Sequence, residues 1–387
     1  MSSPEWVENK LCSEEYTPVR CADVLDALSF WRGAPFYAET PLVPLPGAAK
    51  ALGIGGLYLK DESRRFGLGA FKVMGALYAM ARALGARSWA EAANSAQRRT
   101  FYTATDGNHG RAVAWCARRL RQRAVVLMPK GSAEARRQAI AAEGAEVHVT
   151  EVNYDDSVRM ARDLACADEN GLLLQDTTLP GYVDVPLDIM RGYSAVAAEA
   201  SERLPAPPTH VILQAGVGSF AGGTASALTS LYPHARPTFL VAETAAAPCL
   251  MRSAASGRVC TVPGEIDTIM AGLACGEPCT LGLEALLSRA RFFAALPDEC
   301  ASDAMRALAM PEPGDEAVTA GESGAAGYAL LRAVMLSPEL APLRAAAGLN
   351  EHSRVLVFNT EGATDPENYA RIVGNFAGHP PSKDVLY

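Results

Sequence analysis

Short apolar segments alternate with longer segments of mixed character along most of the chain. The apolar segments are residues 57–59, 100–102, 124–128, 145–149, 172–175, 211–213, 239–241 and 355–358. Most are uninterrupted runs, which is typical of strands buried on both faces of a parallel sheet. The segments between them predict helices at 70–84, 111–120, 133–142, 155–168 and 224–231, with Ser132 placed to cap the third. The pattern predicts an α/β protein with mostly parallel, twisted sheets flanked by helices.

The bulk composition narrows the class of protein. A chain of 387 residues is too long for one compact core, so two domains are expected. Hydrophobic residues make up 49% and charged residues 20%, as in soluble globular enzymes. The net charge of −8, without a long Lys or Arg run, argues against nucleic acid as a partner. The polar, acidic residues 1–8 and the lack of an apolar run of bilayer length predict a cytoplasmic protein without a membrane partner.

The nine cysteines do not form the pattern of a disulfide scaffold. No Cys-x-x-Cys or His-Glu-x-x-His occurs, so no metal site is expected. Cys249, Cys260, Cys275 and Cys279 cluster in the sequence, and we interpret them as small, buried apolar residues. A disulfide between Cys249 and Cys275 is the alternative, which mass spectrometry of unreduced peptides would test.

Lys72 is the candidate residue with the most specific chemistry. It follows the polar segment 61–69 and lies at the start of an otherwise apolar helix. A buried amine is costly unless it is neutralised, paired or used covalently. A lysine kept neutral by burial is the nucleophile that Schiff-base chemistry needs. The alternative is a lysine whose stem packs while its ammonium reaches water.

A polar turn at residues 103–110 follows the predicted strand at 100–102 and opens the next helix. Backbone amides at a helix N-terminus favour anionic groups. Asn108 offers both a donor and an acceptor, and Asp106 adds a carboxylate at the same rim. The turn is therefore a candidate binding element, with a simple helix cap as the alternative.

A glycine-rich turn at residues 214–223 follows the strand at 211–213. The backbone N–H groups of residues 216–219 can all point at one phosphate, and the dipole of the helix that follows favours its negative charge. A dinucleotide fingerprint is present only in outline, because Ala221 takes its third glycine position and Glu243 is the one acid placed to bind a ribose. A cradle for a single phosphate fits at least as well, and a turn that only packs a strand against a helix is the remaining alternative.

A hydroxyl at Thr360, in the turn after the last predicted strand, completes the set of candidates. In chain order, the lysine, the Asn turn, the glycine loop and the late hydroxyl resemble the fold-type II pyridoxal-phosphate enzymes, the superfamily of the tryptophan synthase β-subunit. This resemblance covers roughly residues 37–365. Within the superfamily, the chain looks most like the diaminopropionate ammonia-lyase family. The stretches that carry this likeness are 61–72, 103–111, 175–193, 267–278 and 360–366.

The resemblance implies a role for each candidate. Lys72 would bind pyridoxal phosphate as a Schiff base and then act as the base at the substrate Cα. Asn108 would contact the 3-oxygen of the cofactor, and Thr360 would face its pyridine nitrogen. Asp106 and Asp176 would recognise a second, cationic amino group, and Asp106 would also take the Cα proton from the face opposite Lys72. The residues expected to hold the phosphate are Gly216, Val217, Gly218 and Ser219.

The resemblance also implies a reaction and an architecture. The reaction is the α,β-elimination of 2,3-diaminopropionate to pyruvate and ammonia through aminoacrylate. The architecture is a large domain of residues 1–85 and 194–387 and a mobile small domain of residues 86–193, with the cofactor in the cleft between them. A homodimer is the expected assembly.

Two departures from the family pattern keep the substrate open. Gly69 stands where the family usually has Asn, and Thr178-Leu179-Pro180 replaces an Ala-Trp-x stretch. Both lie next to residues expected near the substrate. The alternatives are a serine or threonine dehydratase-like enzyme, or a β-replacement enzyme acting on an unusual amino acid in a biosynthetic pathway. A non-catalytic sensor would have lost Lys72 or the phosphate loop, and the imperfect fingerprint argues against a nicotinamide oxidoreductase.

Overall fold

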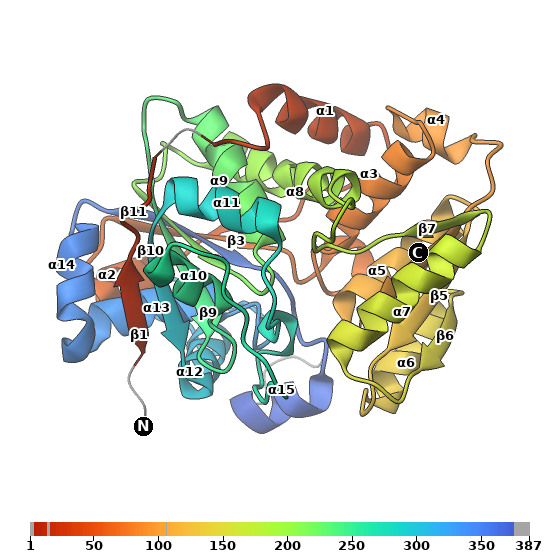
Figure 1. Ribbon diagram of the computed structural model, residues 1–387. Helices are drawn as coiled ribbons and strands as arrows, with labels where there is room; N and C mark the ends of the chain where they lie inside the picture. Colours follow the sequence, from red (N-terminus) through yellow and green to blue (C-terminus); the bar gives the residue numbers. More distant parts are fainter. Residues whose placement is uncertain (1–3, 14–15, 106, 375–387) are drawn as a thin grey trace.

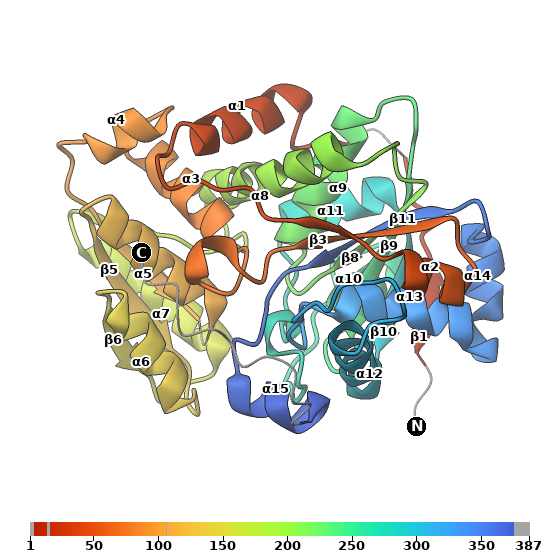
Figure 2. The same ribbon diagram turned by 180° about the vertical axis from the view of Figure 1, so that it is seen from behind.

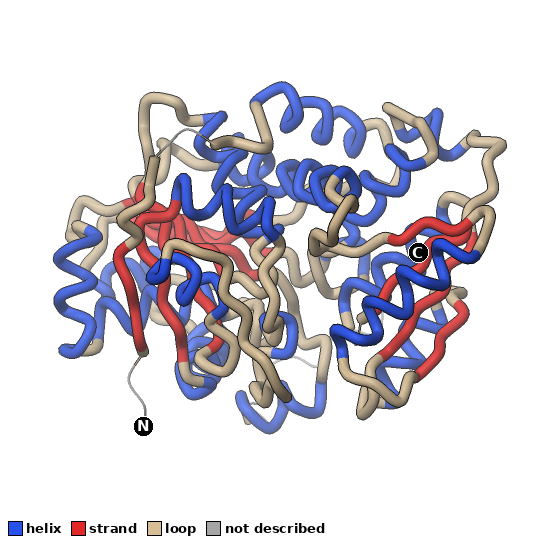
Figure 3. Tube along the Cα trace, in the orientation of Figure 1, coloured by secondary structure: helices blue, strands red, loops and turns tan. Residues whose placement is uncertain are grey.

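The computed structural model describes residues 4–13, 16–105 and 107–374. These residues form two separate sheets, each with helices packed on both faces (Figure 1, Figure 3). The predicted α/β fold with mostly parallel sheets flanked by helices is therefore confirmed. Asp106, one of the candidate residues, lies outside the described residues.

The larger sheet has seven strands in the described part of the chain. In spatial order they are β1 (Glu5–Glu8), β10 (Ala290–Leu296), β9 (Thr238–Thr244), β8 (His210–Gln214), β11 (Arg354–Asn359), β3 (Gly56–Asp61) and β2 (Leu42–Pro44). The five inner strands pair in parallel, and the two edge strands pair antiparallel to their neighbours. The inner strands are largely buried, which explains their uninterrupted apolar runs.

Helices cover both faces of the larger sheet (Figure 1, Figure 2). One face carries α1 (Cys21–Arg32), α3 (Val73–Ala83), α8 (Asp184–Arg203), α9 (Ser219–Leu231), α10 (Cys249–Ser256) and α11 (Thr280–Arg289). The other face carries α2 (Pro46–Leu52), α12 (Asp298–Ala309), α13 (Ala326–Leu336) and α14 (Ala341–Ala347), with α15 (Pro366–Val373) packed on α12. Two hydrophobic cores result, one on each side of the sheet.

The smaller sheet is parallel throughout and is ordered β6 (Glu146–Val149), β5 (Arg123–Met128), β4 (Thr100–Ala104) and β7 (Gly171–Leu173). The side chains of β5 alternate between its two faces. Val125 and Leu127 pack towards α7 (Tyr154–Ala167), whereas Val126 and Met128 pack towards α5 (Asn108–Arg119) and α6 (Glu134–Ala142). All four strands fall within the predicted small domain, although α8 runs unbroken through residues 193 and 194, so the domain limits stay a prediction.

One smaller sequence prediction needs correction, and one alternative is ruled out. Ser132 does not cap α6, because Ala133 is the residue at the N-cap and the Ser132 hydroxyl donates to the Pro129 carbonyl at 2.8 Å within the preceding turn. Within the described residues Cys249 and Cys275 form no disulfide. The Cys249 thiol instead contacts the Cys275 carbonyl at 3.5 Å, as expected of a small buried residue.

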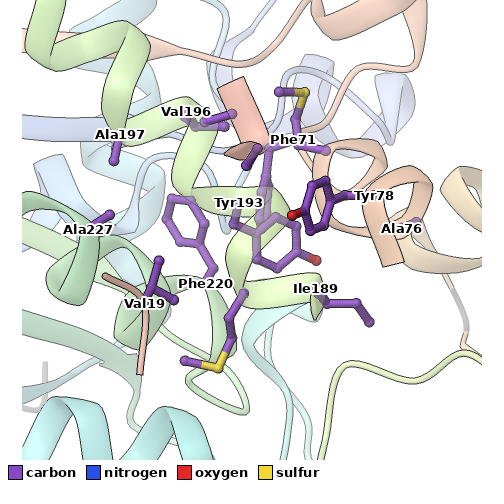
Figure 4. Packing of buried hydrophobic residues seen from close by; sticks show 14 of the residues in the cluster. Val19, Phe71, Ala76, Tyr78, Ile189, Tyr193, Val196, Ala197, Phe220 and Ala227 are labelled. Carbon is purple, nitrogen blue, oxygen red and sulfur yellow. The ribbon is translucent and has the colours of Figure 1, made fainter. Parts of the chain in front are cut away.

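Aromatic packing fixes the start of α3, where Lys72 lies. Phe71 contacts Tyr193 of α8 and Phe220 of α9, with ring centroids 4.8 and 4.4 Å away (Figure 4). Gly75 lets α3 approach α8, because a Cβ there would lie 2.6 Å from the Tyr193 ring. The residue before Lys72 is therefore anchored in the core.

Four fully buried charged side chains link the loop that precedes Lys72 to β3 and α8. Lys60 lies 2.5 Å from Glu199, and Arg65 lies 2.7 Å from both Glu62 and Glu199. Thr40 accepts a hydrogen bond from Lys60 at 2.5 Å and from Arg65 at 2.9 Å. Two positive and two negative charges balance, which is the condition under which buried ions are tolerated.

Replacing Arg65 with alanine is expected to lower the free energy of unfolding by about 3–5 kcal/mol, because it leaves two buried carboxylates with one cation. Urea denaturation at pH 7, followed by circular dichroism, measures this change. Arg64 is the matched control, because it is adjacent and exposed, and its replacement should cost less than about 0.5 kcal/mol. Equal losses in the two variants would contradict a stabilising network.

Candidate active site

Lys72 immediately precedes α3, and its ammonium faces Asp176, which lies just beyond β7 of the smaller sheet. The Nζ–Oδ2 distance is 2.5 Å, and the two side chains are 21% and 7% exposed. Burial alone would lower the pKa of Lys72, but the Asp176 carboxylate raises that pKa above its usual value. Burial alone would raise the pKa of Asp176, but the ammonium lowers it to about 2. Lys72 is therefore a paired amine, not one kept neutral by burial or extended into water.

The glycine loop follows β8 and leads into α9. Gly218 has φ +96°, a left-handed conformation that favours glycine, and it occupies the N-cap of α9. A Cβ at Gly216 would lie 3.1 Å from both Cys275 Sγ and the Gly272 carbonyl, so a side chain would crowd the loop. The loop therefore presents the first amides of α9, which a helix leaves without internal partners.

Ser219, the first residue of α9, is fully buried, and its hydroxyl donates to the backbone carbonyl of Asp176 at 2.5 Å. The sequence predicted that Ser219 holds a phosphate, and its hydroxyl is engaged elsewhere, which leaves its backbone amide for that role. Asp176 is thereby bound to Lys72 through its carboxylate and to the loop through its carbonyl. Asp176 therefore contacts both the Lys72 amine and the N-terminus of α9. This arrangement suits a cofactor that carries an aldehyde for the amine and a phosphate for the helix N-terminus.

The Asn turn and the late hydroxyl meet in the same region. Asn108 begins α5, and its amide donates to the Glu361 carboxylate at 2.5 Å, which also accepts the Ser323 amide at 3.1 Å. Thr360 is buried, and its hydroxyl accepts a hydrogen bond from Gln214, the last residue of β8, at 3.0 Å. The structure therefore brings together Lys72, Asp176, Asn108, the glycine loop and Thr360.

Several residues that hold this site were not among the sequence candidates. Glu361 is the partner of Asn108, and its sequence signal is its place directly after Thr360, within the stretch 360–366. Gln175 is fully buried and hydrogen-bonds Thr103, Ala104 and Tyr154, which fixes the position of the next residue, Asp176. Polar residues beside a motif carry no distinctive pattern, so only their contacts reveal them.

His109 also ties the site together. Its Nε2 lies 3.0 Å from the Leu174 carbonyl, which is only an acceptor, so this nitrogen carries the proton. Burial lowers the pKa of His109, with the nearby Lys72 acting in the same direction and Asp176 opposing it. A neutral imidazole therefore joins the first turn of α5 to the strand end that leads to Asp176.

Glu243 does not have the geometry of a ribose ligand. It is fully buried, and its two carboxylate oxygens accept the amides of Leu250 and Met251 at 2.8 and 2.7 Å. Burial raises its pKa to about 8 in spite of these two donors. Glu243 caps α10, which removes the observation that supported a dinucleotide site.

Gly69 has a backbone reason for its identity. It has φ +78°, and its carbonyl accepts the Gly362 amide at 2.9 Å. Glycine and asparagine are the residues that adopt this conformation most readily, so Gly for Asn is conservative for the backbone. The glycine therefore suits the backbone conformation that this turn requires.

Within the described residues, no group of three or more His, Cys, Asp or Glu is placed to hold a metal ion. None of the described helices is long and apolar enough to cross a membrane.

The two sheets, the lysine at a helix start, and the glycine cradle at the end of a parallel strand together define an α/β enzyme of the type that binds a phosphorylated aldehyde cofactor. Residues 34–360 match the family described as pyridoxal-phosphate dependent enzyme, and the chain belongs to this family. Its cofactor is therefore pyridoxal phosphate.

Individual relatives sharpen the comparison. The chain is 43% identical over 350 residues to diaminopropionate ammonia-lyase of Escherichia coli strain K12, covering 87% of each chain. The crystal structure of the Escherichia coli enzyme in complex with D-serine has a TM-score of 0.90 and 39% identity, covering 96% of this chain and 97% of that one. A structure of the same enzyme in complex with an aminoacrylate–PLP azomethine reaction intermediate has a TM-score of 0.89 at 39% identity, covering 97% of both chains.

Proposed function

We propose that this protein catalyses the pyridoxal-phosphate-dependent α,β-elimination of 2,3-diaminopropionate, which yields pyruvate and ammonia through aminoacrylate. The observation that carries the proposal is the partly buried Lys72–Asp176 ion pair, in which the backbone carbonyl of Asp176 also accepts the hydroxyl of Ser219, the last residue of the phosphate cradle. The similarity to diaminopropionate ammonia-lyases, which extends over nearly the whole chain, supports the same reaction.

Lys72 and Asp176 have separate roles in the proposed reaction. Pyridoxal phosphate supplies an electron sink that stabilises negative charge at the substrate Cα. Lys72 provides the amine for covalent attachment of the cofactor, and once released it takes the Cα proton. Asp176 pairs with the β-ammonium of the substrate until that group leaves as ammonia. Aminoacrylate then reacts with water to give pyruvate and a second ammonia.

The remaining candidates orient the cofactor. The backbone amides at residues 216–219 bind the phosphate, because an anion is favoured at a helix N-terminus. Asn108 is held by Glu361 and would contact the 3-oxygen of the cofactor. Thr360 accepts its hydrogen bond from Gln214, so its own hydrogen is available for an unprotonated ring nitrogen. A neutral hydroxyl leaves the ring nitrogen unprotonated, and an unprotonated ring nitrogen favours elimination over transamination.

The function is tested by incubating the purified protein with 2,3-diaminopropionate, L-serine and L-threonine and measuring pyruvate or 2-oxobutyrate together with ammonia. We expect the highest kcat/KM for 2,3-diaminopropionate, with two ammonia released per pyruvate. Faster turnover of L-serine or L-threonine would replace the proposal with the dehydratase alternative. A replaced β-substituent in the product would indicate a β-replacement enzyme.

Asp106 is proposed as a second base, on the face of the substrate opposite Lys72. Replacing it with asparagine should lower kcat/KM for one enantiomer of 2,3-diaminopropionate by about 10²–10⁴-fold, the contribution of a positioned base. The other enantiomer should lose less than about 10-fold. Separate assays of the two enantiomers measure the difference, and an equal loss on both would rule out the two-face arrangement.

Assembly, domain movement and location are proposed on the same resemblance. We infer a homodimer in the cytoplasm, with the smaller sheet and its helices moving as one unit against the larger sheet. Size-exclusion chromatography with light scattering tests the dimer. Small-angle scattering with and without substrate tests the domain movement, and an unchanged profile would argue against it.

A further inference from the structure

The segment that follows Asp176 reaches from the smaller sheet to the helices of the larger one. Thr178 accepts a hydrogen bond from the backbone amide of Thr280 at 2.8 Å, and the two hydroxyls lie 2.8 Å apart. Thr280 is the first residue of α11, and within the described chain Cys279, at the N-cap, makes no side-chain cap bond. Thr178 therefore caps α11 from a distant part of the sequence.

The start of α11 is part of the cofactor cradle. The Cys279 amide donates to the Val217 carbonyl at 2.8 Å, and a Cβ at Gly282 would lie 2.6 Å from the carbonyl carbon of Gly218. The bond from Thr178 thus ends on an element packed directly against the glycine loop. Together with the bond from Ser219 to the Asp176 carbonyl, it fixes the segment at two points.

Leu179 lies next to this bond in a tight turn. Its amide and carbonyl both pair with Tyr182, at 3.2 and 2.9 Å, and Gly181 between them has φ +75°. Its side chain lines a cavity of about 30 Å³. Thr177 and Val217 are among the other residues that line it.

Two of the residues that line this cavity are neighbours of the proposed reaction centre. Thr177 directly follows Asp176, and Val217 belongs to the glycine loop. A volume of about 30 Å³ accommodates only about one or two water molecules. The half-buried Leu179 therefore occupies space that a larger group on the substrate would need.

We propose that Thr178 and Leu179 form a gate that sets the largest Cβ substituent the site accepts. Leu179 limits the volume next to Asp176, and Thr178 holds Leu179 in place through its bond to α11. The proposal rests on the proposed function, because Asp176 is the residue expected to meet the leaving group.

The size limit is tested with Leu179→Ala and two substrates, 2,3-diaminopropionate and S-benzylcysteine, which both yield pyruvate on elimination. The ratio of kcat/KM for S-benzylcysteine to that for 2,3-diaminopropionate should rise at least about 10-fold, since even one methylene in a pocket changes discrimination by about 10–200-fold. Leu179→Val should give a smaller rise and covers the case in which Leu179→Ala is unfolded. A ratio that is unchanged in both variants overturns the size limit.

The activity of the wild type on 2,3-diaminopropionate shows whether an unchanged ratio contradicts the size limit or the proposed function itself. If the wild type releases no pyruvate from that substrate but does so from L-serine, the function is wrong, and the ratio is then taken against L-serine. Met160→Ala, at an exposed position on α7, is the control and should leave the ratio within about 2-fold of wild type.

The positioning role of Thr178 is tested by hydrogen exchange, which is independent of turnover. Thr178→Val should speed amide exchange in the first turn of α11 by about 10-fold, corresponding to a lost cap of about 1.4 kcal/mol. Thr178→Ser should restore the wild-type rate, because it keeps the acceptor. In Thr178→Val, KM for S-benzylcysteine should fall while kcat stays within about 3-fold. Unchanged exchange at α11 overturns the positioning role.

Discussion

Replacing Lys72 with alanine is expected to lower the turnover of 2,3-diaminopropionate by at least about 10⁴-fold, the upper range for a positioned acid–base group. Alanine can neither attach the cofactor covalently nor take up a proton at Cα. The same variant should lose the absorbance near the visible edge that a lysine-bound cofactor gives. Spectra and initial rates on one preparation measure both effects.

Lys72→Arg is the matched control for this experiment. Arginine keeps a positive charge opposite Asp176 but stays protonated, so it cannot act as a nucleophile. We expect the same loss of activity and absorbance with a melting temperature close to wild type. Lys72→Ala should melt at a lower temperature, because it leaves the buried Asp176 without its partner. Substantial activity in Lys72→Arg would contradict a covalent role.

The sequence predicts every inner strand except β10, because a strand buried on both faces has to be apolar throughout. The same reasoning misses β1, whose outer residues Glu5 and Glu8 are exposed at the sheet edge. It also misses the inner strand β10, an alanine-rich run whose second residue, Arg291, is exposed and which directly follows α11. Edge position and alanine content both weaken the signal on which strand prediction depends.

Candidate site residues could be chosen where a strand-end turn has a distinctive composition, as at Asn108 and residues 216–219, and their roles stay a prediction. Which side chains pair with one another could not be predicted. Lys72 and Asp176 are 104 residues apart, and Asn108 and Glu361 are 253 apart. No local pattern specifies which distant side chain meets another, so the charge state of Lys72 and the anchoring of Asn108 follow only from the folded arrangement.

Glu243 illustrates an ambiguity that sequence alone cannot resolve. An acid at the end of the strand after a glycine loop suits a ribose, but it equally suits the N-terminus of a following helix. Here α10 begins six residues later, and two of its backbone amides donate hydrogen bonds to the two carboxylate oxygens of Glu243. The decision between the two roles depends on where the next helix starts, and that helix was not predicted.

Replacing Asp176 with asparagine is expected to lower kcat/KM for 2,3-diaminopropionate by roughly 100-fold, because a charge-assisted hydrogen bond at a buried site contributes about 1.5–3 kcal/mol. The loss on serine should be below about 10-fold, since its β-hydroxyl carries no charge for the carboxylate to pair with. Parallel kcat/KM measurements on the two substrates give the ratio that matters. An equal loss on both would mean that Asp176 serves the common chemistry and does not recognise the β-ammonium.

The same variant should change how Lys72 captures the cofactor. The Asp176 carboxylate raises the pKa of Lys72, and only the neutral amine forms a Schiff base, so its removal should let capture begin at a lower pH. Reloading of cofactor-stripped protein, followed by absorbance across a pH series, measures this shift. Asp163→Asn, which removes an exposed carboxylate on α7, should leave the pH dependence unchanged. A shift to higher pH in Asp176→Asn would mean that the carboxylate assists deprotonation of Lys72 more than its charge stabilises the ammonium.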